Sequence, residues 1–344
     1  MRTAVVICPG RGTYGKPELG TLARHFKNRA LLARLDARRT ELGQETLTAL
    51  DSAATYSVAK HTRGDNASAL IYAATFADFA ALQDIEIVAV TGNSMGWYSA
   101  LACAGALTPE NGFEVVNTMG TLMQDHLIGG QLLHPFMDEA WHNNPAQKTA
   151  LLTLTTEINS RPGHSLALSI NLGGMLVLAG NDAGLAAFEA ATPPAQSRFP
   201  LRLANHAAFH TALQAPVAAA GRAKLPGHLF TQPKHPLIDG RGAIWWPHAT
   251  DTAALWQYTL GHQVTEPYDF THAITIAARE FAPDLFIITG PGTTLGGATA
   301  QSLILAKWQG MQSKSDFQTA QSAGPFLISM GMDDQRRLVT GETP

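Results

Sequence analysis

The stretch between residues 85 and 104 restricts the fold of this 344-residue chain more than any other. Ile85–Thr91 is rich in β-branched residues, as buried strands are, and Gly92–Ala104 begins with a tight turn and continues as an alanine-rich helix. Two other short apolar runs, Ala4–Cys8 and Leu285–Thr289, are each followed by Gly and Pro, which end strands. Buried strands that alternate with helices predict an α/β domain with a mostly parallel sheet.

The pattern of elements changes after residue 129. Strand-like runs lie close together there, with few helices between them: Ala150–Glu157, Ser165–Ile170 and Met175–Ala179. Such a cluster predicts a small α+β subdomain inserted into the larger domain. The predicted parts are a large catalytic domain (1–128 and 204–310), a small subdomain (129–203) and a C-terminal extension (311–344).

Composition and charge exclude several classes of protein. The formal net charge is −3 and no Lys/Arg-rich block occurs, which argues against a nucleic-acid partner. The apolar run Ala4–Cys8 is too short for a signal peptide, and no run approaches the 18 apolar residues of a membrane span. The two cysteines, Cys8 and Cys103, cannot form a disulfide framework and suit a reducing compartment. We therefore expect a cytoplasmic protein with no membrane partner.

The turn Gly92–Gly96 has the pattern G-x-S-x-G between a strand and a helix, as in a nucleophile elbow. The glycines allow a turn too tight for side chains, so that the hydroxyl of Ser94 stands clear of the sheet. The backbone N–H of Met95 and the start of the helix then face the developing oxyanion. The alternative is a chance strand–turn–helix junction at which the serine only caps the helix.

A second glycine-containing turn, Pro9–Gly12, follows the first predicted strand and can supply another oxyanion N–H. A phosphate-binding loop is the competing interpretation, but the turn has neither P-loop nor dinucleotide-binding spacing. Gly290–Gly292 with Gly296 also suggests a dinucleotide site. No full βαβ unit with an acidic partner follows it, so this interpretation is rejected.

Histidine spacing raises the question of a metal. His206 and His210 are four residues apart, as two zinc ligands on a helix are. No Glu follows His206 as in H-E-x-x-H, and no third ligand is evident, so we expect no metal site.

Four segments, in this order, resemble motifs of the malonyl-CoA:acyl-carrier-protein transacylase family. Pro9–Gly12 resembles the family's P-G-Q-G turn, and Gly92–Leu101 resembles G-H-S-L-G-E-Y-S-A-L. Phe209–Leu213 resembles the start of F-H-S-P-L-M, which carries the catalytic histidine, and Gly290–Gly292 resembles G-P-G. The resemblance covers roughly residues 3–305.

The resemblance implies an α/β-hydrolase-like large domain, an inserted ferredoxin-like small subdomain and a ping-pong acyl transfer. His210 would take the proton of Ser94, because a serine hydroxyl is a weak nucleophile without an adjacent base. Ser94 would then attack an acyl-CoA thioester, with the oxyanion held by the backbone N–H groups of Met95 and Arg11. The family orients its histidine with a backbone carbonyl, which falls at Gln263 here.

The family's partners and cofactors carry over in the same way. The resemblance implies acyl-CoA and an acyl carrier protein as partners, with the phosphopantetheine on the carrier and no cofactor bound permanently. It also implies a monomer. Asn171 resembles an active-site asparagine of the small subdomain, and it is a candidate for substrate binding.

Three departures from the family bear on the substrate. Asn93 stands where the family has His, and Trp97 where it has Glu. Met119 stands where malonyl-specific members have the arginine that pairs with the substrate's carboxylate. A carboxylate in a partly dry pocket without a cation loses water with nothing in exchange, so we expect uncharged acyl groups such as acetyl. The competing hypothesis is a local slip in the correspondence or a substitute cation, for which Arg11 is the candidate.

Two alternative functions remain open at this point. An acyl-thioester hydrolase would use the same serine and histidine with water as acceptor. A non-catalytic homologue would only dock a carrier protein, although the presence of both Ser94 and His210 argues against it.

Overall fold

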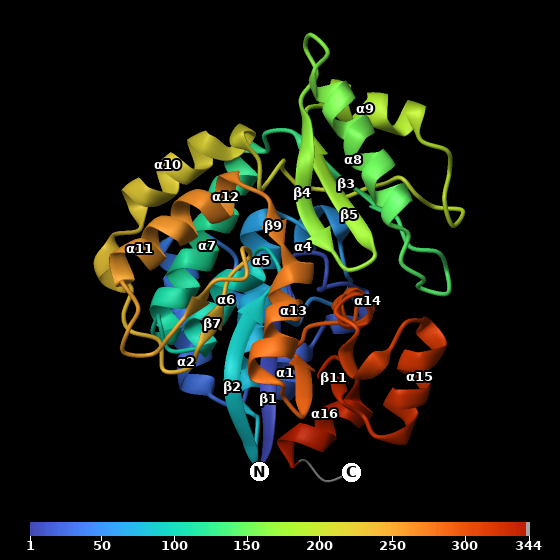
Figure 1. Cartoon of the computed structure of the whole chain (residues 1–344). Helices are drawn as coiled ribbons and strands as arrows, with labels where there is room; N and C mark the ends of the chain where they lie inside the picture. Colours follow the sequence, from blue (N-terminus) through green and yellow to red (C-terminus); the bar gives the residue numbers. More distant parts are fainter. Residues whose placement is uncertain (342–344) are drawn as a thin grey trace.

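A six-stranded sheet organises the larger part of the computed structural model, which describes residues 1–341 (Figure 1). The strand order is β11-β10-β1-β2-β7-β8, and all neighbours are parallel except β8, which runs antiparallel to β7. The strands are β1 (Arg2–Cys8), β2 (Ile85–Gly92), β7 (Leu237–Ile238), β8 (Ile244–Trp245), β10 (Leu285–Ile288) and β11 (Leu327–Ser329). The predicted strands at Ala4–Cys8, Ile85–Thr91 and Leu285–Thr289 are therefore confirmed.

Helices pack on this sheet because its central strands are apolar on both faces. Helix α6 (Gly96–Cys103) contacts β1 and β2, α13 (Phe270–Phe281) contacts β2, and α5 (Gly64–Ala80) packs on α7 (Pro109–His126). Most of α5 is buried, which explains why its sequence is apolar around the whole helix.

The remaining helices of this part lie around the same core. They are α1 (Thr21–His25), α2 (Arg29–Glu41), α3 (Leu47–Asp51), α4 (Val58–His61), α10 (Ala215–Lys224), α11 (Thr252–Gln257), α12 (Gln263–Thr265), α14 (Leu295–Leu305), α15 (Lys314–Ala323) and α16 (Asp333–Thr340).

A second sheet of five strands stands above the first in Figure 1, in the order β6-β3-β5-β4-β9. Its elements are β3 (Gly130–Pro135), α8 (Pro145–Asn159), β4 (Leu166–Leu172), β5 (Met175–Gly180), α9 (Asp182–Ala191), β6 (Leu201–Arg202) and β9 (Tyr268–Asp269). The succession β3-α8-β4-β5-α9-β6 is the ferredoxin-like β-α-β-β-α-β unit. The predicted α/β fold class is confirmed, and the exact domain boundaries stay a prediction.

One predicted strand of this unit is wrong. Residues 150–157 lie inside helix α8, which begins at Pro145 with its N-terminus capped by the side chain of Asn144. Leu151, Thr155 and Ile158 are buried at helical spacing against the small sheet. Threonines between the leucines suggested a strand, but the cap and the 3.6-residue period decide the structure.

The predicted C-terminal extension contributes to the large sheet. Strand β11 pairs in parallel with β10. Arg336 of α16 forms a buried ion pair with Asp78, whose carboxylate also accepts a hydrogen bond from the backbone N–H of Gly290 (2.6 Å). The tail therefore supports the turn after β10. Residues 342–344 lie outside the described residues.

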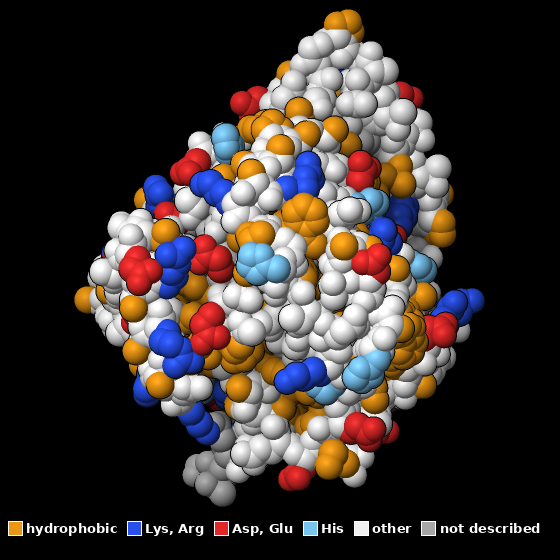
Figure 2. Space-filling view, turned by 90° about the vertical axis from the view of Figure 1, so that its left-hand side faces the viewer, with side chains coloured by type: hydrophobic (Ala, Val, Ile, Leu, Met, Phe, Trp, Pro, Cys, Tyr) orange, Lys and Arg blue, Asp and Glu red, His pale blue; other side chains and the backbone are white. Residues whose placement is uncertain are grey.

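The surface carries charges of both signs. On the face shown in Figure 2, Lys and Arg side chains lie among Asp and Glu rather than in a block of one sign. Across residues 1–341, no helix combines the length and the apolar character that crossing a bilayer requires.

Candidate active site

Ser94 lies at the turn between β2 and α6. Its backbone is left-handed (φ 55°), which costs a residue with a side chain about 1–3 kcal/mol. Gly96 opens α6 so close to β1 that a Cβ there would lie 2.1 Å from the carbonyl oxygen of Cys8. A Cβ on Gly10 would lie 2.5 Å from the carbonyl oxygen of Asn93. The two glycine-containing turns therefore abut at the carboxyl ends of neighbouring parallel strands.

A hydrogen bond joins Ser94 to His210. The serine Oγ lies 2.8 Å from Nε2 of the imidazole, and Nδ1 lies 2.6 Å from the backbone carbonyl oxygen of Gln263. Because a carbonyl only accepts hydrogen bonds, Nδ1 carries the proton of the neutral ring. Nε2 is then free to accept the serine proton. This geometry is that of a nucleophile, a general base and a group that orients the base.

The imidazole of His210 is completely buried. Burial lowers its pKa to about 4, the carbonyl of Gln263 opposes that shift, and His262 adds slightly to it. At neutral pH the ring is therefore uncharged, which is the form that accepts a proton.

The side chain of Gln263 makes two further contacts at the same centre. Its Nε2 donates to the backbone carbonyl of Ser94 (3.0 Å), and its Oε1 accepts from the hydroxyl of Tyr98 (2.9 Å). Gln263 begins α12 directly after the π-helical segment Tyr258–His262. Such segments are often found at functional sites.

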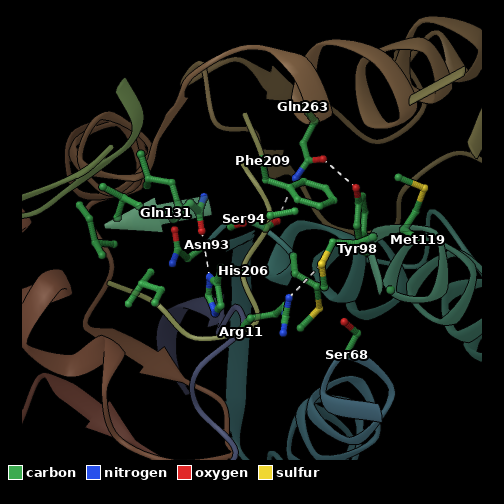
Figure 3. Close-up of a pocket in the computed structure, with 18 residues that line it drawn as sticks. Arg11, Ser68, Asn93, Ser94, Tyr98, Met119, Gln131, His206, Phe209 and Gln263 are labelled. Carbon is green, nitrogen blue, oxygen red and sulfur yellow. Dashed lines mark hydrogen bonds between the residues drawn. The ribbon is translucent and has the colours of Figure 1, made fainter. Parts of the chain in front are cut away.

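A cavity of about 110 Å³ opens beside Ser94, between the large sheet and the small one (Figure 3). Roughly 10–15 Å³ of such space holds one water, so the cavity has room for a short acyl group. Apolar side chains line much of it: Met95, Met119, Met123, Ile170, Leu172, Val177, Leu203 and Phe209. Polar side chains line the rest: Arg11, Ser68, Asn93, Tyr98, Gln131, His206 and Gln263.

Arg11 brings a positive charge into this cavity. Its guanidinium donates to the backbone carbonyl of Thr62 (2.6 Å) and to the sulfur of Met123 (3.3 Å), neither of which is charged. Its Nε is buried and has no acceptor among residues 1–341. Burial lowers the pKa of Arg11 to about 10, partly opposed by Asp65, so it stays a cation at neutral pH.

Comparison with known proteins bears on what such a site does. No family model matches the chain. A malonyl CoA-acyl carrier protein transacylase from Salmonella typhimurium is 26% identical over 213 residues, and one from Escherichia coli O157:H7 is 24% identical over the same length. Each match spans 61% of this chain and 64% of the curated relative.

Solved structures agree with this likeness. An acyl-carrier-protein S-malonyltransferase from Burkholderia pseudomallei superposes with a TM-score of 0.70 at 23% identity, over 88% of this chain and 93% of that one. A malonyl-transacylase solved in complex with a type II PKS acyl-carrier protein superposes with a TM-score of 0.73 at 19% identity, over 99% and 100%. The resemblance to the malonyl-CoA:acyl-carrier-protein transacylase family is confirmed.

Most residues that the transacylase resemblance singles out lie together in the structure. Ser94, His210 and the carbonyl of Gln263 form one hydrogen-bonded chain. The other candidates at the cavity are Arg11, Asn93, Met95 and Met119. Their roles in substrate binding and in the oxyanion hole stay proposals.

Asn171 is placed differently. Its side chain donates to Asp269 (2.9 Å) and accepts from Lys148 (3.1 Å), and it is not among the residues that line the cavity. Trp97, which replaces the transacylase glutamate, is fully buried and donates its indole N–H to Thr259 (3.0 Å). That departure therefore changes packing under the site rather than the wall of the cavity.

Sequence reasoning missed four polar side chains that line the cavity: Ser68, Tyr98, Gln131 and His206. Tertiary packing brings them there, and although Tyr98 lies within the motif Gly92–Leu101, no pattern marked the role of any of the four. His206 drew attention only through its spacing from His210. Across the described chain, no three His, Cys, Asp or Glu residues are grouped so that they could hold a metal ion.

Proposed function

We propose that this chain is an acyltransferase that moves a short acyl group from CoA to the phosphopantetheine thiol of an acyl carrier protein. The observation that carries the proposal is the 2.8 Å contact between Ser94 Oγ and Nε2 of an uncharged, oriented His210 beside the cavity. The names of the curated relatives support this reaction. The solved complex of a malonyl-transacylase with its carrier protein supports the partner.

The proposed reaction has two half-reactions. His210 Nε2 takes the hydroxyl proton as Ser94 Oγ attacks the thioester carbonyl, and the backbone N–H groups of Met95 and Arg11 stabilise the oxyanion. The C–S bond breaks, His210 returns the proton to the CoA sulfur, and an acyl ester remains on Ser94. The carrier thiol then gives its proton to His210 and attacks the ester carbonyl. The C–O bond to Ser94 breaks, His210 returns the proton to Ser94 Oγ, and the acyl group leaves as a thioester of the carrier.

We further propose that Arg11 takes the place of the carboxylate-binding arginine that Met119 replaces. Its buried Nε–H has no protein acceptor in the described chain, and its other contacts are uncharged. A carboxylate of the acyl group would complete the hydrogen bonding of this buried cation. The substrate class is then a carboxylated acyl group such as malonyl, rather than the uncharged group that Met119 alone predicts.

The test is intact mass and peptide mapping after incubation with malonyl-CoA or acetyl-CoA, followed by addition of a holo carrier protein. We expect an acyl adduct on Ser94 that moves to the carrier thiol. Ser94→Ala should abolish the adduct, whereas Ser99→Ala, which removes a buried hydroxyl on α6 that has no hydrogen-bond partner in the described chain, should keep it. CoA release with no transfer would indicate hydrolysis. The absence of both an adduct and CoA release would overturn the proposal.

A further inference from the structure

A second imidazole, that of His206, lies in the acyl cavity. In Figure 3 it stands between Gln131 and Arg11, below Asn93. It lines the cavity together with Ser94, but its hydrogen bond goes to Gln131 rather than to Ser94, and it has no part in the proposed proton transfer. What His206 can offer an acyl chain depends on which of its ring nitrogens carries a proton.

Three hydrogen bonds decide which nitrogen of His206 carries the proton. The hydroxyl of Ser169 donates to the backbone carbonyl of Phe209 (2.9 Å), so its oxygen accepts from Nε2 of Gln131 (2.7 Å). The carboxamide oxygen of Gln131 therefore faces Nδ1 of His206 (2.9 Å). An amide oxygen only accepts, so Nδ1 is the protonated nitrogen.

The charge state of His206 determines whether its Nε2 donates or accepts a hydrogen bond. Burial and the neighbouring Arg11 both lower the pKa of this imidazole well below 6.5. The ring is therefore neutral at pH 7, with its proton on Nδ1. Nε2 is left as a hydrogen-bond acceptor, although a cation stands beside it.

Asn93 adds a second acceptor next to the nucleophile. Its Oδ1 is buried and receives no hydrogen bond from residues 1–341. A buried acceptor left without a donor costs roughly 1–3 kcal/mol, so a ligand that supplies a donor is favoured over one that does not. The positive charge of Arg11 disfavours an ammonium group at this place and leaves a hydroxyl as the matching donor.

We propose that His206 contributes to acyl specificity, and that the cavity prefers short acyl groups whose chain carries a hydroxyl, both with and without the carboxylate that Arg11 would bind. The hydroxyl donates its one proton to Nε2 of His206, with Oδ1 of Asn93 as the alternative acceptor. This inference rests on the proposed acylation of Ser94 and adds a substrate class to it. A site built to accept from a hydroxyl discriminates against the analogue that lacks it, because its acceptor is then left unpaired.

Four acyl-CoA thioesters of equal chain length test the proposal: butyryl-, 3-hydroxybutyryl-, succinyl- and malyl-CoA. They form two pairs that differ by one hydroxyl, one pair without and one pair with a carboxylate. The measured quantity is the rate of Ser94 acylation by intact mass. In both pairs we expect the hydroxylated member to react about tenfold faster. Equal rates within both pairs would overturn the proposal.

Variants of His206 identify the residue responsible. His206→Asn keeps a donor toward Gln131 and removes the acceptor at Nε2, so the hydroxyl preference should fall well below tenfold. His206→Gln keeps a polar atom within reach of the Nε2 position and should retain part of the preference. His228→Asn, at an exposed histidine, serves as the matched control. An unchanged preference in His206→Asn would overturn the assignment.

Binding without reaction separates this inference from the proposed function. Calorimetry on Ser94→Ala measures the affinity for each of the four thioesters. If none of them, nor malonyl- or acetyl-CoA, acylates the native protein, the proposed function fails. Tighter binding of the hydroxylated members by Ser94→Ala would still support the role of His206, and equal affinities would overturn it.

Discussion

The side-chain amide of Gln263 donates a hydrogen bond to the backbone carbonyl of Ser94 across 3.0 Å. The backbone carbonyl of the same residue orients the imidazole of His210. One residue therefore fixes both the turn that carries Ser94 and the imidazole that contacts its hydroxyl. The hydroxyl of Tyr98 completes this arrangement, because it donates to Oε1 and so sets which end of the amide faces Ser94.

We expect Gln263→Leu to slow acylation of Ser94 by about 10- to 100-fold, and Tyr98→Phe to slow it less. The substitutions remove the side-chain bonds and keep the backbone carbonyl, and small displacements of reacting groups have effects of that order. Single-turnover mass spectrometry measures the rate. Tyr72→Phe is the matched control, since it removes a buried tyrosine bond to Pro109 away from the site. Rates like those of the native protein in both site variants would contradict the role.

The pH dependence of acylation should reflect the environment of His210. Burial lowers its pKa to about 4, and the base works only when unprotonated. The rate should therefore stay level as pH falls from 8 to 5, and then decline with a midpoint near 4 rather than 6.5. Circular dichroism in the same buffers separates loss of the base from unfolding. A midpoint near 6.5 in folded protein would show that the ring is more exposed to water in solution.

Local patterns predicted the elbow well. The geometry of the turn Gly92–Gly96 could be predicted locally, because the strand before it and the helix after it are adjacent to it in sequence. His210 was found through the family resemblance, and its contact with the carbonyl of Gln263 agrees with that expectation. Helix α8 was mispredicted because a run of leucines and threonines suits a buried strand as well as a buried helix face.

Contacts made by tertiary packing could not be predicted in the same way. Tyr98 on α6 and Gln263 on α12 are far apart in sequence, and so are Gln131 and His206, yet tertiary packing brings each pair into contact. No local pattern records which way a side chain points once two sheets pack. Arg11 was a candidate for the missing cation, and only the structure shows that its Nε lacks a protein partner in the described chain.

Arg11→Gln should slow acylation by malonyl-CoA by about 10- to 100-fold and change acetyl-CoA acylation little. A charge-assisted hydrogen bond to a carboxylate is lost in the first case only. Arg11→Lys keeps the charge and should restore part of the malonyl rate. Arg63→Gln, which alters a nearby arginine already paired with Asp65, is the control. If Arg11→Gln leaves the ratio of malonyl to acetyl rates unchanged, the carboxylate binds elsewhere.

Met119→Arg places an arginine where the transacylase resemblance leads one to expect it, and should nevertheless destabilise the protein. Met119 is 2% exposed on α7, and its sulfur packs within 2.7 Å of where a Cβ on Gly221 of α10 would lie. An arginine there must displace α10 and bring a second cation into the cavity that already holds Arg11, a cost of about 3 kcal/mol. Thermal unfolding measures the effect, with Met119→Leu as the control of similar volume.

Combining Met119→Arg with Arg11→Gln leaves a single cation, so the double variant should be more stable than Met119→Arg alone. A native melting temperature in Met119→Arg would show that the cavity accommodates both charges.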